Sequence, residues 1–288
     1  MKAGSNRMKV PNSKIKLNKD LLNKAIIVIC IITLIYSLSK IGIIYYDSFR
    51  NKNLITGIQG MFYNQQQFKA KTFRETSFDK VLRSIVLNES ESTSTDINNL
   101  IKQETLMKYD QLLEINEDVV GWIKVPNTKI DYPVMQSSDN LYYLDKTINL
   151  EKNRAGSIFM DFRNGGDGED KHTILYGHHM RDGTMFKGLI KYENEDFFNN
   201  QSIIQFDTLF EEQKWEVFSA YVTGVGFDYL KTNFNTPDEY KTFLTTIQEK
   251  SLFPSDVVLT ENDQILTLST CTYDYNEARL VVHAKKIE

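Results

Sequence analysis

The sequence predicts a mainly β domain, an antiparallel barrel or sandwich with peripheral helices, preceded by one N-terminal transmembrane helix. Three observations lead to this fold class. A long apolar run lies near the N-terminus, short segments rich in Val, Ile, Tyr and Phe fill the chain from residue 119 onward, and few helical patterns lie between them. The 288 residues, 41% hydrophobic and 12% aromatic, suffice for a sizeable core.

The apolar run covers residues 25–46 and contains a single charge, Lys40. As a helix it is roughly 33 Å long, about the thickness of the hydrocarbon core of a bilayer. A buried helix of a soluble domain is a weaker interpretation because nearly every face is apolar, and a cleaved signal peptide is weaker because no A-x-A-like site follows. We therefore predict that residues 25–46 are a single-pass signal anchor in the cell membrane.

The distribution of charge predicts the orientation of this anchor. Residues 1–24 hold seven basic side chains and one acidic side chain, which leaves 27 basic and 37 acidic side chains for the rest of the chain. Basic residues before a membrane helix favour a cytoplasmic N-terminus, so we expect 1–24 in the cytoplasm and the acidic body outside. The net charge of −4 gives no electrostatic footprint for nucleic acid, and we expect no such partner.

After the anchor, residues 47–95 have the composition of a juxtamembrane spacer with helical tendency, ending in the polar break NESESTSTD at 88–96. The folded domain is expected at 96–288. It opens with an amphipathic helix marked by five apolar side chains, Ile97, Leu100, Ile101, Leu112 and Leu113.

Short β-type segments punctuated by Gly, Asn and Asp then follow. The expected strands are 119–125, 129–135, 156–162, 173–177, 202–207, 214–224, 265–271 and 279–286. The clearest helix begins at Thr236, where T-P-D-E supplies an N-cap, a proline at the first helical position and a capping glutamate. Its apolar side chains recur with helical spacing at Tyr240, Phe243, Leu244 and Ile247.

The chain has two cysteines, and only Cys271 lies outside the predicted anchor, because Cys30 is within it. A lone exported thiol has no partner for an internal disulfide, so it is a small core residue or a nucleophile. Cys271 ends the strand-like ILTLSTC directly before a polar loop, a position that fixes a side chain and leaves it accessible to substrate.

A nucleophilic thiol needs a base or a cation for activation. His178 and His179 follow a strand-like TILYG, and neighbouring side chains on a strand point to opposite faces, so a metal half-site made by both is a weak alternative. His283 falls in an alternating strand and is expected to be structural. His172 falls in an acidic loop and is expected to be solvated.

Arg279 opens the strand that follows the Cys271 loop. If 265–271 and 279–286 form an antiparallel hairpin, Arg279 returns to the edge of the sheet where Cys271 lies. A guanidinium there is suited to stabilise an oxyanion, although an arginine that opens a strand can equally be a solvated rim charge.

These segments together resemble a known family. TLSTC at 267–271, Arg279 in ARLVVHAKK and YGHHM at 176–180 resemble the active-site signature of the sortases. Three features resemble the class B branch in particular. They are residues 118–144, GSIFMDFRN at 156–164 and the helix between 214–224 and 265–271. The resemblance covers residues 96–288 and the signal-anchor topology, and it implies the sortase-type antiparallel β-barrel.

The resemblance also implies roles for individual residues. Cys271 is expected to be the nucleophile that attacks the backbone carbonyl of a sorting-signal threonine. His178 is the expected general acid for the leaving amine, and Arg279 is expected to hold the substrate carbonyl or the oxyanion. Ser269 and Thr270 are expected to line the substrate groove. Because the Cys-to-Arg interval varies among sortases, Arg279 is assigned by its strand-opening position.

The expected reaction is transpeptidation in two acyl transfers, without a metal or an organic cofactor. The expected partners are surface proteins with a C-terminal NP-x-T-x-like signal and a lipid II-like peptidoglycan precursor that supplies the acceptor amine. Two alternatives stay open, a pilin-polymerising sortase and a catalytically silent envelope scaffold. The acidic loop NGGDGED at 164–170 lacks the ordered spacing of an EF-hand, so we expect a solvated loop and no calcium site.

Overall fold

The computed structural model describes residues 19–86, 108–224, 226–271 and 278–287, except for the side chains of 68–86 and of Cys271. Two compact units are present, Met1–Tyr46 and Asp47–Glu288. Helix α1, Lys19–Val86, provides the described part of the first unit and the beginning of the second. Residues 25–46 are helical throughout and expose their apolar side chains, so this helix is long and apolar enough to cross a membrane.

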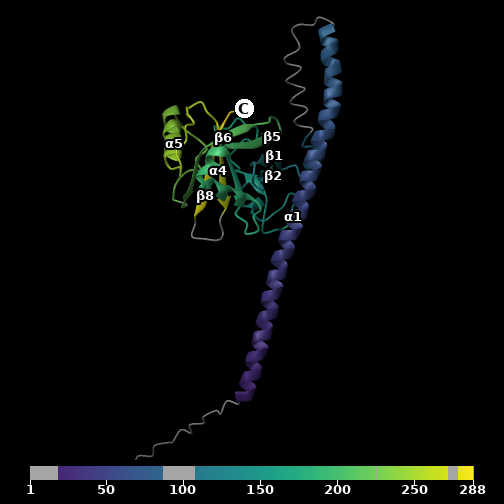
Figure 1. Ribbon diagram of the computed structural model, residues 1–288, viewed down its shortest axis with the longest axis vertical. Coiled ribbons are helices and arrows are strands. Elements are labelled where there is room, and N and C mark those ends of the chain that lie inside the picture. The colour runs from purple at the N-terminus through teal and green to yellow at the C-terminus, as the bar shows by residue number, and fades with distance from the viewer. Residues whose placement is uncertain (1–18, 87–107, 225, 272–277, 288) are drawn as a thin grey trace, which may run out of the picture. The chain divides into compact units, whose positions relative to one another are not determined.

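The second unit is built on a closed barrel with the strand order β1-β2-β3-β4-β7-β8-β6-β5 (Figure 1). Its strands are β1 Val119–Lys124, β2 Asp131–Met135, β3 Ile158–Met160, β4 His172–His178, β5 Ile203–Thr208, β6 Lys214–Thr223, β7 Ile265–Cys271 and β8 Arg279–Lys286. The predicted barrel is thus confirmed, and every expected strand is present. Six neighbouring pairs are antiparallel, whereas β2–β3 and β4–β7 are parallel.

Helices surround the barrel, as the sequence predicts. They are α3 Asp110–Ile115, η1 Tyr142–Leu144, η2 Phe186–Glu193, α4 Glu195–Asn200 and α5 Pro237–Glu249. Helix α5 begins as expected, because the Thr236 hydroxyl accepts a hydrogen bond from the Glu239 amide at 3.1 Å. Of the amphipathic helix predicted before β1, the described part is α3, and Ile97, Leu100 and Ile101 lie outside the described residues.

Part of α1 packs against the outside of the barrel. The ring of Phe62 stacks on Trp122 of β1 with centroids 4.0 Å apart and planes 4° apart, and both side chains are buried. Tyr63 donates to the Asp131 carboxylate at 2.7 Å. Phe62 and Tyr63 fall in the segment predicted as a spacer, so this stretch of helix contributes to the packing of the barrel. The division into a spacer at 47–95 and a catalytic domain at 96–288 stays a prediction.

Candidate active site

The site is organised by the parallel pairing of β4 and β7. Their register runs over seven residues, from His172 opposite Ile265 to His178 opposite Cys271. Because the two strands run in the same direction, they end at the same edge of the barrel. The pairing therefore brings the predicted general acid and the predicted nucleophile to facing positions, although 92 residues separate them in the chain.

The glycine before His178 allows close packing at this edge. A Cβ on Gly177 would lie 2.4 Å from Cδ1 of Ile158 and 2.8 Å from the ring of Phe186. Contacts this short require the neighbours to move, and both neighbours are buried. Gly177 is thus needed for the packing of strand β4 directly before the histidine.

The imidazole of His178 is held by a backbone carbonyl. Its Nε2 lies 2.6 Å from the oxygen of Leu144, and because a carbonyl oxygen only accepts, Nε2 carries the proton in this bond. The side chain is 5% exposed. Gly156 passes close to this carbonyl: it has a φ of +57°, and a Cβ there would lie 2.5 Å from the oxygens of Tyr143 and Leu144.

The second histidine of the pair lies just beyond the strand. His179 forms an isolated bridge with Met185 and is partly exposed. The register of β4 with β7 ends at His178, so His178 is the member of the pair that faces Cys271 across the sheet.

The expected hairpin between β7 and β8 is confirmed. The strands pair antiparallel up to Ser269 opposite Val281, and this register, continued by two residues, sets Arg279 opposite Cys271. The Arg279 guanidinium donates to the carbonyl of Thr270 at 3.1 Å. Because Thr270 directly precedes Cys271, Arg279 lies beside the candidate nucleophile.

The two residues expected to line the groove are buried in the structure. The Ser269 hydroxyl lies 2.9 Å from the hydroxyl of Tyr229, and the Thr270 hydroxyl accepts from the amide of Leu280 at 3.0 Å. Both hydroxyls therefore have partners within the domain. Their role in substrate binding stays a prediction.

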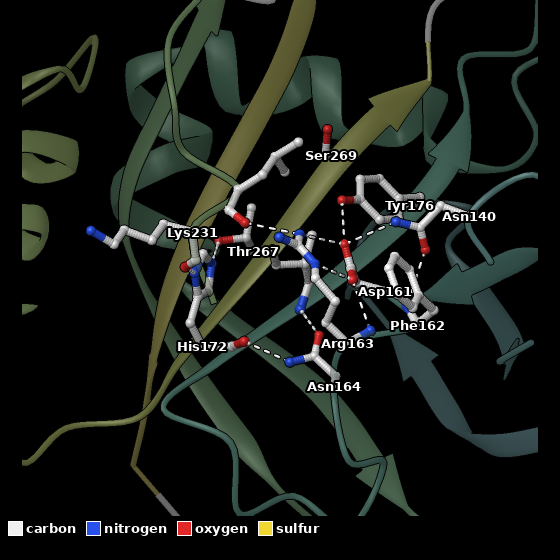
Figure 2. Close-up of polar contacts among 12 residues, drawn as sticks. Asn140, Asp161, Phe162, Arg163, Asn164, His172, Tyr176, Lys231, Thr267 and Ser269 are labelled. Atoms are coloured by element: carbon white, nitrogen blue, oxygen red, sulfur yellow. Dashed lines mark hydrogen bonds and ion pairs between the residues drawn. The ribbon is translucent and has the colours of Figure 1, made fainter. Parts of the chain in front are cut away.

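A buried carboxylate, that of Asp161, lies among polar side chains next to β4, a role that no sequence pattern indicates (Figure 2). Asp161, which follows β3, is 0% exposed and accepts from the hydroxyl of Tyr176 at 2.8 Å and from Asn140 at 3.0 Å. Arg163 binds both of its oxygens at 2.8 Å. Burial raises the pKa of Asp161, but the hydrogen bonds from Arg163 and Tyr176 outweigh it and hold the pKa below its usual value. Asp161 and Arg163 lie in GSIFMDFRN at 156–164, the segment that resembles class B.

The prediction that His172 is solvated is wrong. It begins β4, is 0% exposed, and its pKa is lowered to about 4 because burial disfavours the charged ring. The acidic composition of residues 164–170 suggested a loop that reaches His172, but β4 starts one residue earlier than predicted. The prediction that His283 is structural is confirmed, since it is fully buried between Thr267 and Tyr221 at 2.7 and 2.8 Å.

Carboxylates of the acidic loop bind its own backbone. Asp170 accepts from the amide of Gly165 at 2.9 Å, and Asp167 accepts from the amide of Glu169 at 3.1 Å. Within the described part of the chain, no group of three or more His, Cys, Asp and Glu side chains is arranged to hold a metal ion.

A cysteine and a histidine on facing strand ends, with a guanidinium at the next strand, are the groups that thiol-based acyl transfer needs. The comparisons agree with this class of site. The family model of the sortase domain matches residues 123–287. The chain belongs to the sortase family and is a cysteine transpeptidase.

The relatives define the branch. Sortase B of Listeria monocytogenes is 30% identical over 271 residues, which cover 93% of this chain and 98% of that protein. Sortase B of Staphylococcus aureus is 43% identical over 183 residues, 63% of this chain and 75% of that protein. A solved structure described as a Staphylococcus aureus sortase B-substrate complex matches with a TM-score of 0.67 and 33% identity, over 84% of this chain and 99% of that one. Within the family, this chain is a class B sortase.

Proposed function

We propose that Cys271, His178 and Arg279 are the catalytic residues of this transpeptidase. The register that sets His178 opposite Cys271 is the observation that carries the proposal. The bond from Arg279 to the carbonyl of Thr270 supports it, because it brings the guanidinium next to the residue that reacts. Ser269 and Thr270, the two residues before Cys271, are proposed to contribute to the wall of the substrate groove.

The proposed reaction has two steps. In the first step, the Cys271 thiolate attacks the backbone carbonyl carbon of a threonine, and Arg279 stabilises the oxyanion. The C–N bond then breaks, the amine leaves with a proton from His178, and the acyl group stays on sulfur as a thioester. In the second step an incoming amine attacks the thioester carbonyl, its proton returns to the imidazole, and the thiolate leaves.

The proposed substrate is a surface protein with a C-terminal NP-x-T-x-like sorting signal, and the proposed acceptor is the amine of a lipid II-like peptidoglycan precursor. The exposed apolar helix at residues 25–46 supports a single-pass anchor. The seven basic side chains before it support a cytoplasmic N-terminus and an extracytoplasmic site. An anchored enzyme of this orientation meets both substrates at the outer surface of the membrane.

Product analysis tests the substrate and the acceptor together. The full-length protein in detergent is incubated with NP-x-T-x peptides, with peptides in which alanine replaces the threonine, and with either a peptidoglycan-type amine or a lysine-containing peptide. We expect cleavage after threonine and transfer to the peptidoglycan-type amine, detected by mass spectrometry. Cleavage of the alanine peptides at an equal rate contradicts the proposed signal. Transfer only to lysine favours a polymerising enzyme instead.

A further inference from the structure

The segment 226–236, between β6 and α5, contains no helix or strand, yet side chains from the barrel hold it at several points. Two consecutive backbone carbonyls of this segment accept hydrogen bonds from two side chains. One donor lies between β3 and β4, and the other is the first residue of β4. Arg163 donates to the oxygen of Leu230 at 2.9 Å, and Nδ1 of His172 lies 2.7 Å from the oxygen of Lys231 (Figure 2). We call this pair of bonds the carbonyl clamp.

The proton positions in the clamp follow from its partners. A carbonyl oxygen only accepts, so Nδ1 of His172 carries the proton. The ring is neutral, and Nε2 therefore accepts from the Thr267 hydroxyl, which lies 2.6 Å away. Thr267 in turn accepts from Nδ1 of His283 at 2.7 Å, and Nε2 of His283 accepts from the hydroxyl of Tyr221 at 2.8 Å. Each hydrogen bond in this buried row therefore has one defined donor and one defined acceptor. His172 accordingly presents a fixed N–H donor to the segment.

Arg163 is oriented in the same way. The Asp161 carboxylate binds Nε and Nη2 of the guanidinium, and Nη2 is the atom that also reaches Leu230. A planar guanidinium held on two nitrogens has little freedom to turn, so its remaining direction of donation is set. Asp161 is thereby a positioning group for the clamp.

The clamped segment lies beside the reacting positions. Tyr229, the residue before the clamp, is buried against Val281 and bonds the Ser269 hydroxyl at 2.9 Å. Ser269 is two residues before Cys271 on β7 and faces Tyr176 of β4, which is two residues before His178. A shift of the segment would therefore move groups next to the end of the β4–β7 pair.

We propose that Arg163 and His172 are positioning residues of the transpeptidase. By holding the carbonyls of Leu230 and Lys231, they set segment 226–236 against β4 and β7 in the arrangement that receives the peptide substrate. This inference rests on the proposed function for the identity of the peptide. The clamp itself is a property of the fold that is measurable without turnover.

A set of histidine variants of the full-length protein separates the clamp from general stability. The first variant is His172→Gln, and His283→Gln is its control. In the wild type both rings lie in the same buried row, and each substitution removes the Nδ1 donor of one ring. Only His172 donates to the segment. In His172→Asn the amide nitrogen is placed about where Nδ1 was, so the bond to Lys231 is kept. The side chain of Arg163 is 35% exposed, so Arg163→Lys can test the clamp if the buried variants fold poorly. This substitution keeps the charge but loses the planar guanidinium.

The first readout is hydrogen–deuterium exchange of the amides in 226–236. We expect exchange to rise by about tenfold in His172→Gln and Arg163→Lys, with no comparable change in His283→Gln or His172→Asn. The second readout is turnover of an NP-x-T-x peptide, for which KM should rise by about fivefold in the same two variants. Alkylation of Cys271 by iodoacetamide should change by less than about twofold in all of them, because the strands that carry the site are intact.

Several results overturn the proposal. Unchanged exchange in His172→Gln and Arg163→Lys shows that the segment does not depend on the clamp. An equal rise in His283→Gln reduces the effect to general stability. Faster exchange with an unchanged KM shows that the segment does not serve the substrate. A wild-type enzyme that turns over no such peptide contradicts the proposed signal, and the exchange comparison alone then decides whether the clamp exists.

Discussion

Two histidines on one face of β4 lie at opposite ends of the strand and have different partners. His172 begins the strand, is fully buried, and has a partner at each ring nitrogen, the Lys231 carbonyl and the Thr267 hydroxyl. His178 ends the strand opposite Cys271 and is bound through Nε2 to the Leu144 carbonyl. The two positions are six residues apart, so they share a face of the strand and differ only in how far along it they lie.

The comparison shows that distance from the strand end separates a structural histidine from a candidate acid. At the start of β4, the carbonyl of Lys231 in segment 226–236 binds His172, and burial lowers the pKa of this ring to about 4. Both ring nitrogens of His172 are bound by partners within the domain, so neither is available to exchange a proton with a substrate. At the end of β4 the polypeptide passes into the loop after His179, and this edge of the barrel is where the proposed function places the peptide.

Removing the proposed general acid should give the largest effect on activity. We expect His178→Ala to lower kcat/KM by about a thousandfold, within the range of general acid–base catalysis. His179→Ala should lose less than about tenfold, because His179 lies beyond the β4–β7 register. Steady-state kinetics of the two variants with one sorting peptide measures the ratio. Equal losses would argue for a joint role of the two rings.

The pH dependence of stability tests whether the folded protein shields His172 from protons. The pKa of His172 is lowered from 6.5 to about 4 by burial, so the unfolded state binds a proton that the folded state excludes, and stability falls as the pH falls from 6.5 to 4. The loss should reach about 3 kcal/mol of unfolding free energy.

Denaturant titrations of the wild type and of His172→Asn at pH 7 and pH 4 isolate this contribution, because the other titrating groups are common to both proteins. The wild type should lose about 3 kcal/mol more than the variant over this interval. An equal loss in the two proteins would mean that His172 is accessible to protons in the folded state.

Arg279→Lys should have a smaller effect on the reactive end. Lysine supplies a charge without the planar pair of donors, and loss of one directed donor to an oxyanion costs about a hundredfold or more. We expect kcat/KM to fall by at least about fiftyfold, while iodoacetamide still alkylates Cys271 at a normal rate. A lysine variant with nearly normal transpeptidation would identify Arg279 as a rim charge.

Local patterns explain why the elements were predictable. The eight strands, the cap at Thr236 and the hairpin that returns Arg279 to Cys271 depend on residues close together in the chain. The parallel pairing of β4 with β7 joins segments about ninety residues apart, and no local pattern specifies it. The resemblance to the sortases, rather than periodicity, predicts that Cys271 and His178 belong to one site.

The misplaced histidine and the unforeseen network have the same cause. The acidic residues before His172 predict a loop, whereas His172 lies in β4 and is bound to the carbonyl of Lys231, far along the chain. In the sequence, Asp161 and Arg163 have the pattern of ordinary loop charges. Their partners are Tyr176, Asn140 and the Leu230 carbonyl, which come from other parts of the chain. Burial of a polar group is a property of tertiary packing, and a single sequence does not display it.

The central claim is that the end of the β4–β7 pair performs acyl transfer through Cys271. Acid quenching of the full-length protein shortly after addition of an NP-x-T-x peptide without acceptor, followed by tryptic mapping, locates the acyl group. Cys30 is the only other cysteine and serves as an internal control. The account predicts a hydroxylamine-sensitive adduct on the peptide that contains Cys271 and none in Cys271→Ala. An adduct elsewhere, or normal transfer by Cys271→Ala, would contradict it.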